Sequence, residues 1–148
     1  MHLVRLIALS AAAAIGIIAC SSEDSPEEQV RTAIAEIELA AEARDTGDVI
    51  AWLDPAYRDA HGNDVEEVRR LLRGYFLTNQ SIHLLTRIEE LTFPHPDEAR
   101  VVLQVAMVGR EADAAKAWNL AGDLHRFEVA LISQDDRWLV TWARWQRR

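Results

Sequence analysis

The chain has 148 residues and a mass of 16.7 kDa, which is enough for one domain whose hydrophobic core needs no disulfide. Its 24 acidic and 16 basic residues give a formal net charge of −8. Such an excess of negative charge opposes binding to phosphate backbones and to anionic membrane surfaces, so we expect no nucleic-acid partner. The single cysteine, Cys20, excludes an internal disulfide.

An uncharged segment lies near the start of the chain. Residues 6–19 follow Arg5 and are apolar or small throughout. They are too few to cross a bilayer core of about 30 Å as a helix, which takes about 20 apolar residues. This length and the preceding positive charge are typical of a secretory signal peptide, which we predict at residues 1–19. The alternative interpretation is an uncleaved membrane helix with a buried free thiol.

The end of this segment resembles the lipobox of bacterial lipoproteins. Ile17 and Ile18 are aliphatic, Ala19 is small, and Cys20 follows directly. In that family the cysteine thiol receives a diacylglycerol, the signal is cut before it, and the new amino group is usually acylated too. Each buried methylene contributes about 0.8 kcal/mol, so several acyl chains give stable anchoring. The resemblance implies lipidation of Cys20. Because Ser21 rather than aspartate follows, it also implies the outer membrane.

Two further segments complete the predicted domain map. Residues 20–25 are the lipidated cysteine and a short acidic tether, and residues 26–148 are one domain facing the periplasm. Loss of the signal peptide would remove the positive charge of Arg5 and change the net charge from −8 to −9. Attachment to the membrane must then come from the lipid rather than from a basic patch.

Helical patterns fill the first half of this domain. A capping box at 25–28, with proline at the first helical position, predicts a helix that ends near Gly47. Residues 48–59 indicate a short second helix, broken at Asp54–Pro55. A third helix is predicted over 65–76, where apolar residues recur at helical spacing on one face.

The second half of the domain has the pattern of β-strands. Strands are predicted over 81–93, 99–108, 123–133 and 137–145, with a hairpin turn between the last two. Residues 109–121 indicate a short helical insertion between the second and third strands. The tryptophans of the last segment also fit helical spacing, but the alternation within that segment favours a strand.

The closing sequence carries a family resemblance. Three helices followed by four antiparallel strands that end in Asp135, Asp136, Trp138, Val140 and Trp142 resemble the nuclear transport factor 2-like superfamily. The resemblance implies an α+β, cystatin-like fold with N-terminal helices packed on a curved four-stranded antiparallel sheet. It also implies a cone-shaped pocket and association into a homodimer. This fold serves enzymes, binding modules and scaffolds alike.

Side-chain alternation and the second helix supply the predicted pocket. On residues 123–133, the apolar positions share one face with a histidine, and on residues 137–145 a tryptophan and an arginine share a face with Val140. The second helix adds two aromatic residues. The predicted ligand-pocket residues are Trp52, Tyr57, His125, Phe127, Trp142 and Arg144. Trp118 and Trp145 are expected to be exposed.

Patterns that would indicate catalysis or metal binding are weak. The histidines of the predicted domain lack the spacing of metal ligands on one element, so we predict no metal and no cofactor. Enzymes of the resembled fold place an aspartate or a histidine near a tyrosine, and an apolar pocket raises the pKa of a carboxyl group there. Asp48, Asp54, Tyr57 and His125 are the candidate acid–base set, although each has a structural explanation.

These observations lead to three functional hypotheses. The first is a non-enzymatic binding or scaffolding module, held by the lipid on Cys20 at the periplasmic face of the outer membrane. Its partner would be a small apolar ligand or another envelope protein. The alternative is a pocket enzyme of the isomerase or polyketide-cyclase type with the Asp/His/Tyr set. The third is a structural module whose cavity is filled by its own side chains.

Overall fold

The computed structural model describes residues 24–108 and 123–148. The predicted signal peptide, Cys20, the helical insertion and Trp118 lie outside the described residues. Within them the elements follow in the order α1 (Pro26–Glu42), α2 (Thr46–Ile50), β1 (Leu53–Asp59), α3 (Val65–Thr78), β2 (His83–His95), β3 (Glu98–Val108), β4 (Leu124–Gln134) and β5 (Arg137–Arg147).

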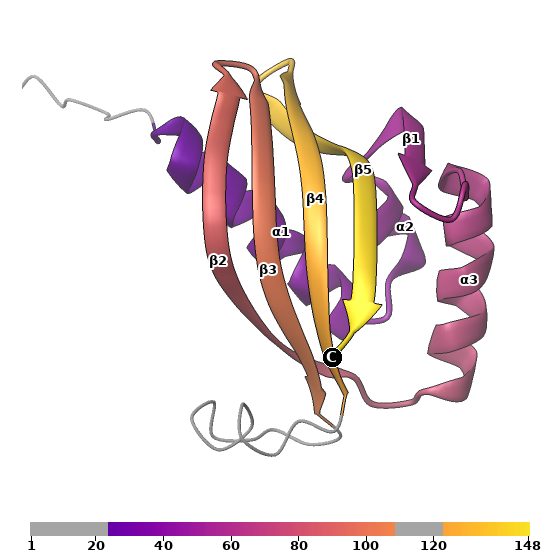
Figure 1. The fold of residues 1–148 in the computed structure, drawn as a ribbon. Coiled ribbons are helices and arrows are strands. Elements are labelled where there is room, and N and C mark those ends of the chain that lie inside the picture. Colours follow the sequence, from indigo (N-terminus) through magenta and orange to yellow (C-terminus); the bar gives the residue numbers. More distant parts are fainter. Residues whose placement is uncertain (1–23, 109–122) are drawn as a thin grey trace, which may run out of the picture.

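All five described strands form one curved sheet in the order β1-β5-β4-β3-β2 (Figure 1). The strands β2 to β5 pair antiparallel with their neighbours, and β1 adds a parallel strand at the edge of β5. The helix α1 runs across one face of the sheet, and α2 and α3 lie beyond β5 (Figure 1). The predicted α+β architecture is therefore confirmed, with five strands in place of four.

The short second helix predicted over residues 48–59 is present only in its first residues, as part of α2, and the additional strand β1 takes the place of the rest. Leu53 pairs with Val140 of β5, whose backbone N–H donates to the Trp52 carbonyl at 2.9 Å. Pro55 has no N–H to donate, but at the edge of a sheet this missing donor is tolerated. The strand forms because β5, far away in the sequence, offers this segment backbone partners that a short isolated helix lacks.

Capping residues start the long helices where the sequence predicts. The Glu28 N–H donates to the Ser25 hydroxyl at 3.2 Å, and the Ser25 N–H donates to the Glu28 carboxylate at 2.8 Å. The same reciprocal bonds begin α3. The helix α1 ends at Glu42 rather than near Gly47, because Arg44 adopts a left-handed φ of 57° and the chain turns there.

The hydrophobic core lies between α1 and the sheet. Val30 of α1 is fully buried, and Val101 and Leu131 of the sheet are each 1% exposed. Trp138 is buried in the same cluster, and its indole N–H donates to the Gln29 side chain at 3.1 Å. The final segment is a strand, as the alternating pattern favours.

A β-bulge divides β5 into two halves. Leu131 pairs with Val140, whereas the preceding residue on β4, Ala130, pairs with Trp142, so Thr141 is an extra residue in β5. Successive side chains of a strand point to opposite faces, and one extra residue therefore moves every later position to the other face. This shift decides which aromatic side chains of β5 face the helices.

Replacement of a core leucine tests this packing. We expect Leu131→Ala to lower the free energy of unfolding by about 2–5 kcal/mol, because it removes buried methyl groups and leaves a void. Leu77 is 83% exposed on α3. The control Leu77→Ala should change the unfolding free energy by less than about 0.5 kcal/mol in urea titrations. Equal effects of the two substitutions would contradict the described core.

Candidate functional site: an apolar cavity

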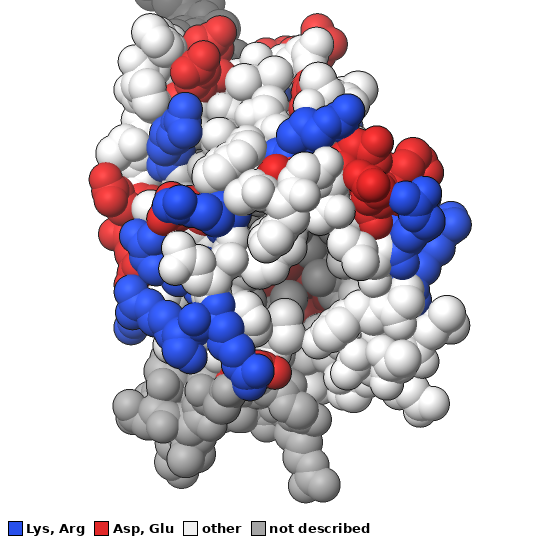
Figure 2. All heavy atoms as spheres, turned by 45° about the vertical axis from the view of Figure 1, so that its right-hand side comes forward, with Lys and Arg blue, Asp and Glu red and all other residues white. Residues whose placement is uncertain are grey.

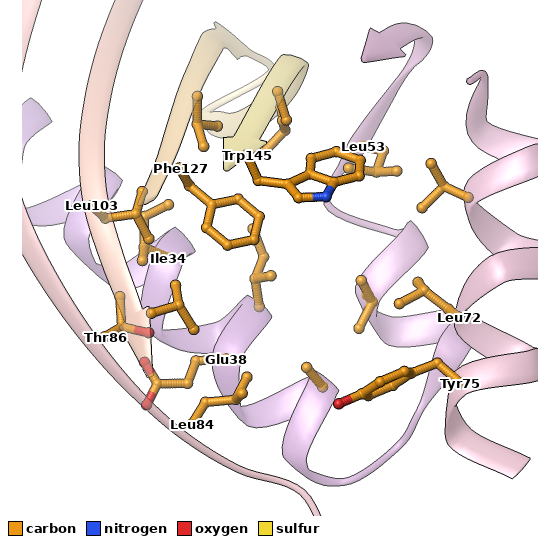
Figure 3. A pocket seen from close by; sticks show the side chains of 18 of the residues that line it. Ile34, Glu38, Leu53, Leu72, Tyr75, Leu84, Thr86, Leu103, Phe127 and Trp145 are labelled. Atoms are coloured by element: carbon orange, nitrogen blue, oxygen red, sulfur yellow. The ribbon is translucent and has the colours of Figure 1, made fainter. Parts of the chain in front are cut away.

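A cavity of about 530 Å³ lies between the helices and the sheet (Figure 3). Every described helix and strand contributes to its lining, which is almost entirely aliphatic and aromatic. The face between the sheet and α3 is hollowed, and many of the side chains around the hollow are uncharged (Figure 2). Small-molecule sites in proteins commonly have volumes of about 300–1,000 Å³ and apolar walls. The apolar lining includes Ile34, Ile37, Val49, Leu72, Phe76, Leu84, Leu103, Val105, Val129 and Val140.

The cavity exists because the apolar face of α3 is only partly covered. Phe76 is 7% exposed, but Leu71 and Tyr75 on the same face are 57% and 39% exposed. All three line the cavity. A helix face with this spacing normally packs onto a core. Here it forms one wall of an open space, and the sheet and α1 form the others (Figure 3).

Two of the six predicted pocket residues line the cavity. Tyr57 is 4% exposed and reaches the cavity from β1, not from a helix as predicted. Phe127 of β4 lies beside Trp145, with ring centroids 6.0 Å apart (Figure 3). Trp145, which the sequence analysis expects to be exposed, also lines the cavity.

Trp142 and Arg144 are not among the lining residues, which corrects the prediction for β5. The bulge at Thr141 moves both side chains to the opposite face of the sheet from Val140. Arg144 there donates to the Glu128 carboxylate at 2.6 Å. Simple alternation along β5, without the bulge, predicts that Trp142 and Arg144 face the cavity, which is wrong.

Trp52 and His125 also lie outside the cavity lining. Trp52 packs against the core, and the Arg137 guanidinium lies 4.9 Å from its ring centre. His125 has its ring 6.4 Å from that of Phe127, and within the described residues its Nδ1 is buried without a hydrogen-bond partner. Neither ring belongs to the site.

Glu38 is a site residue that the sequence analysis missed. Among the described residues that line the cavity, it is the one with a carboxyl group. Its side chain lies beside Thr86 of β2 (Figure 3). Burial raises the pKa of Glu38, the hydrogen bond with Thr86 lowers it, and the neighbouring charge of Glu42 raises it. The sequence contains one signal for this position, because Glu38 follows Ile34 by four residues and so lies on the apolar face of α1.

A second, smaller hollow meets the site at Glu38. Its volume is about 180 Å³, and it is bordered by Ile34, Glu38 and Thr86 together with Arg31. Arg31 forms its ion pair with Glu27, at 2.8 Å. Glu38 therefore borders both the apolar cavity and the smaller hollow.

Two tyrosine hydroxyls and the indole N–H of Trp145 are further polar groups of the cavity lining (Figure 3). Burial, and then the nearby charge of Asp59, raise the pKa of Tyr57, so its hydroxyl remains protonated at physiological pH. The Tyr75 hydroxyl donates to the Met107 sulfur at 3.2 Å. Tyr75 and Glu38 lie on opposite sides of the cavity (Figure 3). A ligand in the cavity would therefore contact mainly apolar side chains and only a few polar groups.

The predicted acid–base set does not assemble in this cavity. Asp48 is exposed in the first turn of α2, and the Asp54 carboxylate accepts from the Ala56 N–H at 2.8 Å. Neither lines the cavity. Within residues 24–108 and 123–148, no group of three His, Cys, Asp or Glu side chains is placed to hold a metal ion. None of the described helices has the length and apolarity to cross a membrane.

Comparison with solved structures identifies the architecture. The chain has the nuclear transport factor 2-like, cystatin-like fold. It is similar to a domain of unknown function with a cystatin-like fold from Nostoc punctiforme, with a TM-score of 0.65 and 12% identity over 82% of this chain and 76% of that one. A putative calcium/calmodulin-dependent protein kinase type II association domain from Thiobacillus denitrificans gives a TM-score of 0.66 and 14% identity, over 84% and 95%.

A further solved structure has the same architecture. A putative scytalone dehydratase from Novosphingobium aromaticivorans has a TM-score of 0.65 and 10% identity, over 82% of this chain and 83% of that chain. No protein-family model and no curated protein matches the sequence. At these identities the likeness shows the fold alone, and the function must be argued from the cavity.

The raised pKa of Glu38 gives a prediction on stability. The folded protein holds the Glu38 proton more tightly than the unfolded chain, so stability falls as the pH rises above the ordinary glutamate pKa of about 4.3. Glu38→Gln removes the ionisation. We expect its melting temperature at pH 7 to exceed that of the wild type by about 1–4 °C. The difference should disappear near about pH 3, where both forms are neutral.

Glu36→Gln is the matched control for this measurement. Glu36 is exposed on the same helix and does not line the cavity. Its replacement should leave the melting temperature unchanged at both pH values. A melting temperature of Glu38→Gln that equals or falls below that of the wild type at pH 7 would contradict the assigned effect of burial.

Proposed function

We propose that this protein binds a small apolar molecule in the cavity while a lipid on Cys20 holds it at the outer membrane. The open cavity of about 530 Å³, with its nearly continuous apolar lining, is the observation that carries the proposal. Transfer of apolar surface from water into such a site is favourable by roughly 25 cal/mol per Å². The size of the space supports a bound ligand over the hypothesis of a cone filled by its own side chains.

The proposed location rests on the sequence. The lipobox resemblance at Ile17, Ile18, Ala19 and Cys20 supports lipidation, and Ser21 supports the outer membrane. A short tether would keep the domain close to the periplasmic face, where apolar molecules are more concentrated than in water. An envelope protein as a partner, and a homodimer, stay predictions.

A second candidate function is acid–base catalysis in the same cavity. The observation that favours it is Glu38, a carboxyl group of raised pKa that lines an apolar cavity together with the protonated Tyr57. A raised pKa makes a carboxyl group a better acid–base catalyst than an ordinary exposed glutamate. Similarity of fold to the putative scytalone dehydratase is consistent with it. In this candidate function, Glu38 takes the role that the predicted acid–base set gives to an aspartate.

Blocking the border of the cavity tests ligand binding. Leu71 lines the cavity and is partly exposed, so Leu71→Trp can narrow the space without disturbing the core. We expect it to weaken the binding of the uncharged fluorescent probe N-phenylnaphthylamine by about tenfold or more, which is 1.4 kcal/mol. Leu77→Trp, on the same helix but outside the lining, should bind as the wild type does. Absence of probe binding to the wild type would refute the proposed function.

Replacement of Cys20 tests the anchor. In Cys20→Ser the thiol that would form the thioether is missing, so we expect loss of labelling with radioactive palmitate and release from the outer-membrane fraction. The control Ser21→Ala keeps the thiol and should keep the label. If Cys20→Ser still carries lipid and sediments with the outer membrane, the proposed anchoring is wrong.

A further inference from the structure

Glu38 limits the chemical class of ligand that the cavity can accept. We infer that the ligand is an apolar molecule with one hydrogen-bond-donating head group, a hydroxyl or an amine, and that the site discriminates against carboxylate anions of fatty-acid type. This inference rests on the proposed binding function and specifies it.

The Glu38 carboxyl group is free of ion pairs within the described part of the chain. The hydrogen bond with Thr86 lowers the pKa of Glu38, and a carboxyl group can accept several hydrogen bonds at once. Arg31 is near, but it pairs with Glu27. A carboxyl group at the border of an apolar space can accept a hydrogen bond from a donor on a ligand.

The charge around this end of the cavity is negative. Glu42 lies close enough to Glu38 to raise its pKa, and its carboxylate accepts from the Leu84 N–H at 2.8 Å. No lysine, arginine or histidine is present among the described lining residues. An anionic head group would therefore enter an apolar space beside like charge and without a cation to pair with, which is unfavourable.

The basic side chains of the neighbouring sheet are occupied on its other face. Arg126 and Arg144 both bond to the Glu128 carboxylate at 2.6 Å, and their side chains lie across the sheet from Val129, which lines the cavity. Alternation along β4 places Glu128 and Val129 on opposite faces. These guanidinium groups are therefore not positioned to neutralise an anion inside the cavity.

The tyrosine hydroxyls do not substitute for a cation. Tyr57 stays protonated and offers a neutral donor, and the Tyr75 hydroxyl already donates to Met107. The indole N–H of Trp145 is another neutral donor, but neutral hydrogen bonds do not replace a cation in offsetting the desolvation of a carboxylate anion in an apolar space. A hydroxyl or an ammonium group on the ligand, in contrast, can donate directly to Glu38, and a bond to a charged acceptor is the stronger kind.

A competition experiment with chain-matched ligands tests the inference. Dodecanol, dodecylamine and dodecanoate share one apolar chain and differ in the head group. Each is titrated at neutral pH, below its micelle concentration, against the full chain with N-phenylnaphthylamine bound. In the wild type we expect dodecanol and dodecylamine to displace the probe at concentrations at least about tenfold lower than dodecanoate. In Glu38→Gln this gap should shrink to about threefold or less, and in the control Glu36→Gln it should persist.

The outcomes separate the ligand class from the binding function. Equal displacement by all three ligands in the wild type, or tighter binding of dodecanoate, overturns the inference and leaves the cavity as a general apolar site. An unchanged gap in Glu38→Gln also overturns it, because another group would then set the preference. Failure of the wild type to bind the probe or any of the three ligands refutes the proposed function itself. If Glu38→Gln does not fold, the order in which the three ligands displace the probe from the wild type decides whether the inference holds.

Discussion

Val30 of α1 is fully buried against the curved sheet, and this helix–sheet contact fixes the positions of the other elements. The indole of Trp138 reinforces it through its bond to Gln29 on the same helix. The helix α1 covers part of that face, and α2 and α3 lie beyond β5 (Figure 1) and form further walls of the space. These helices close the space between α1 and the sheet incompletely, and the cavity is the part that stays open.

The site combines an apolar wall with one carboxyl group, and these two features oppose each other energetically. Burial of Glu38 raises its pKa, so the ionised group disfavours the folded state. A leucine at this position would extend the apolar face of α1 without that effect. Polar groups that disagree with the local pattern are often found at functional sites. This conflict makes Glu38 central both to the proposed binding function and to the alternative acid–base function.

One extra residue in β5 determines the aromatic part of the cavity. Thr141 forms the bulge, so Trp145 faces the helices and stacks on Phe127, whereas Trp142 lies on the outer face. Without the bulge, the two tryptophans would exchange faces, and Arg144 would point towards the helices. The bulge thus influences the shape of the cavity, and it keeps Arg144 out of the described lining. The same exchange explains why simple strand alternation misplaced these residues.

The sequence by itself determined the features that depend on neighbours along the chain. Capping residues set the starts of α1 and α3, and apolar alternation set β2 to β5. The hairpin turn between β4 and β5 has positive φ at both Asp135 and Asp136, which aspartate tolerates. Only the tertiary structure decided the strand β1, the bulge at Thr141 and the exposure of Glu38 to the cavity. Each of these depends on a backbone or side-chain partner distant in the sequence, and local pattern carries no information about such partners.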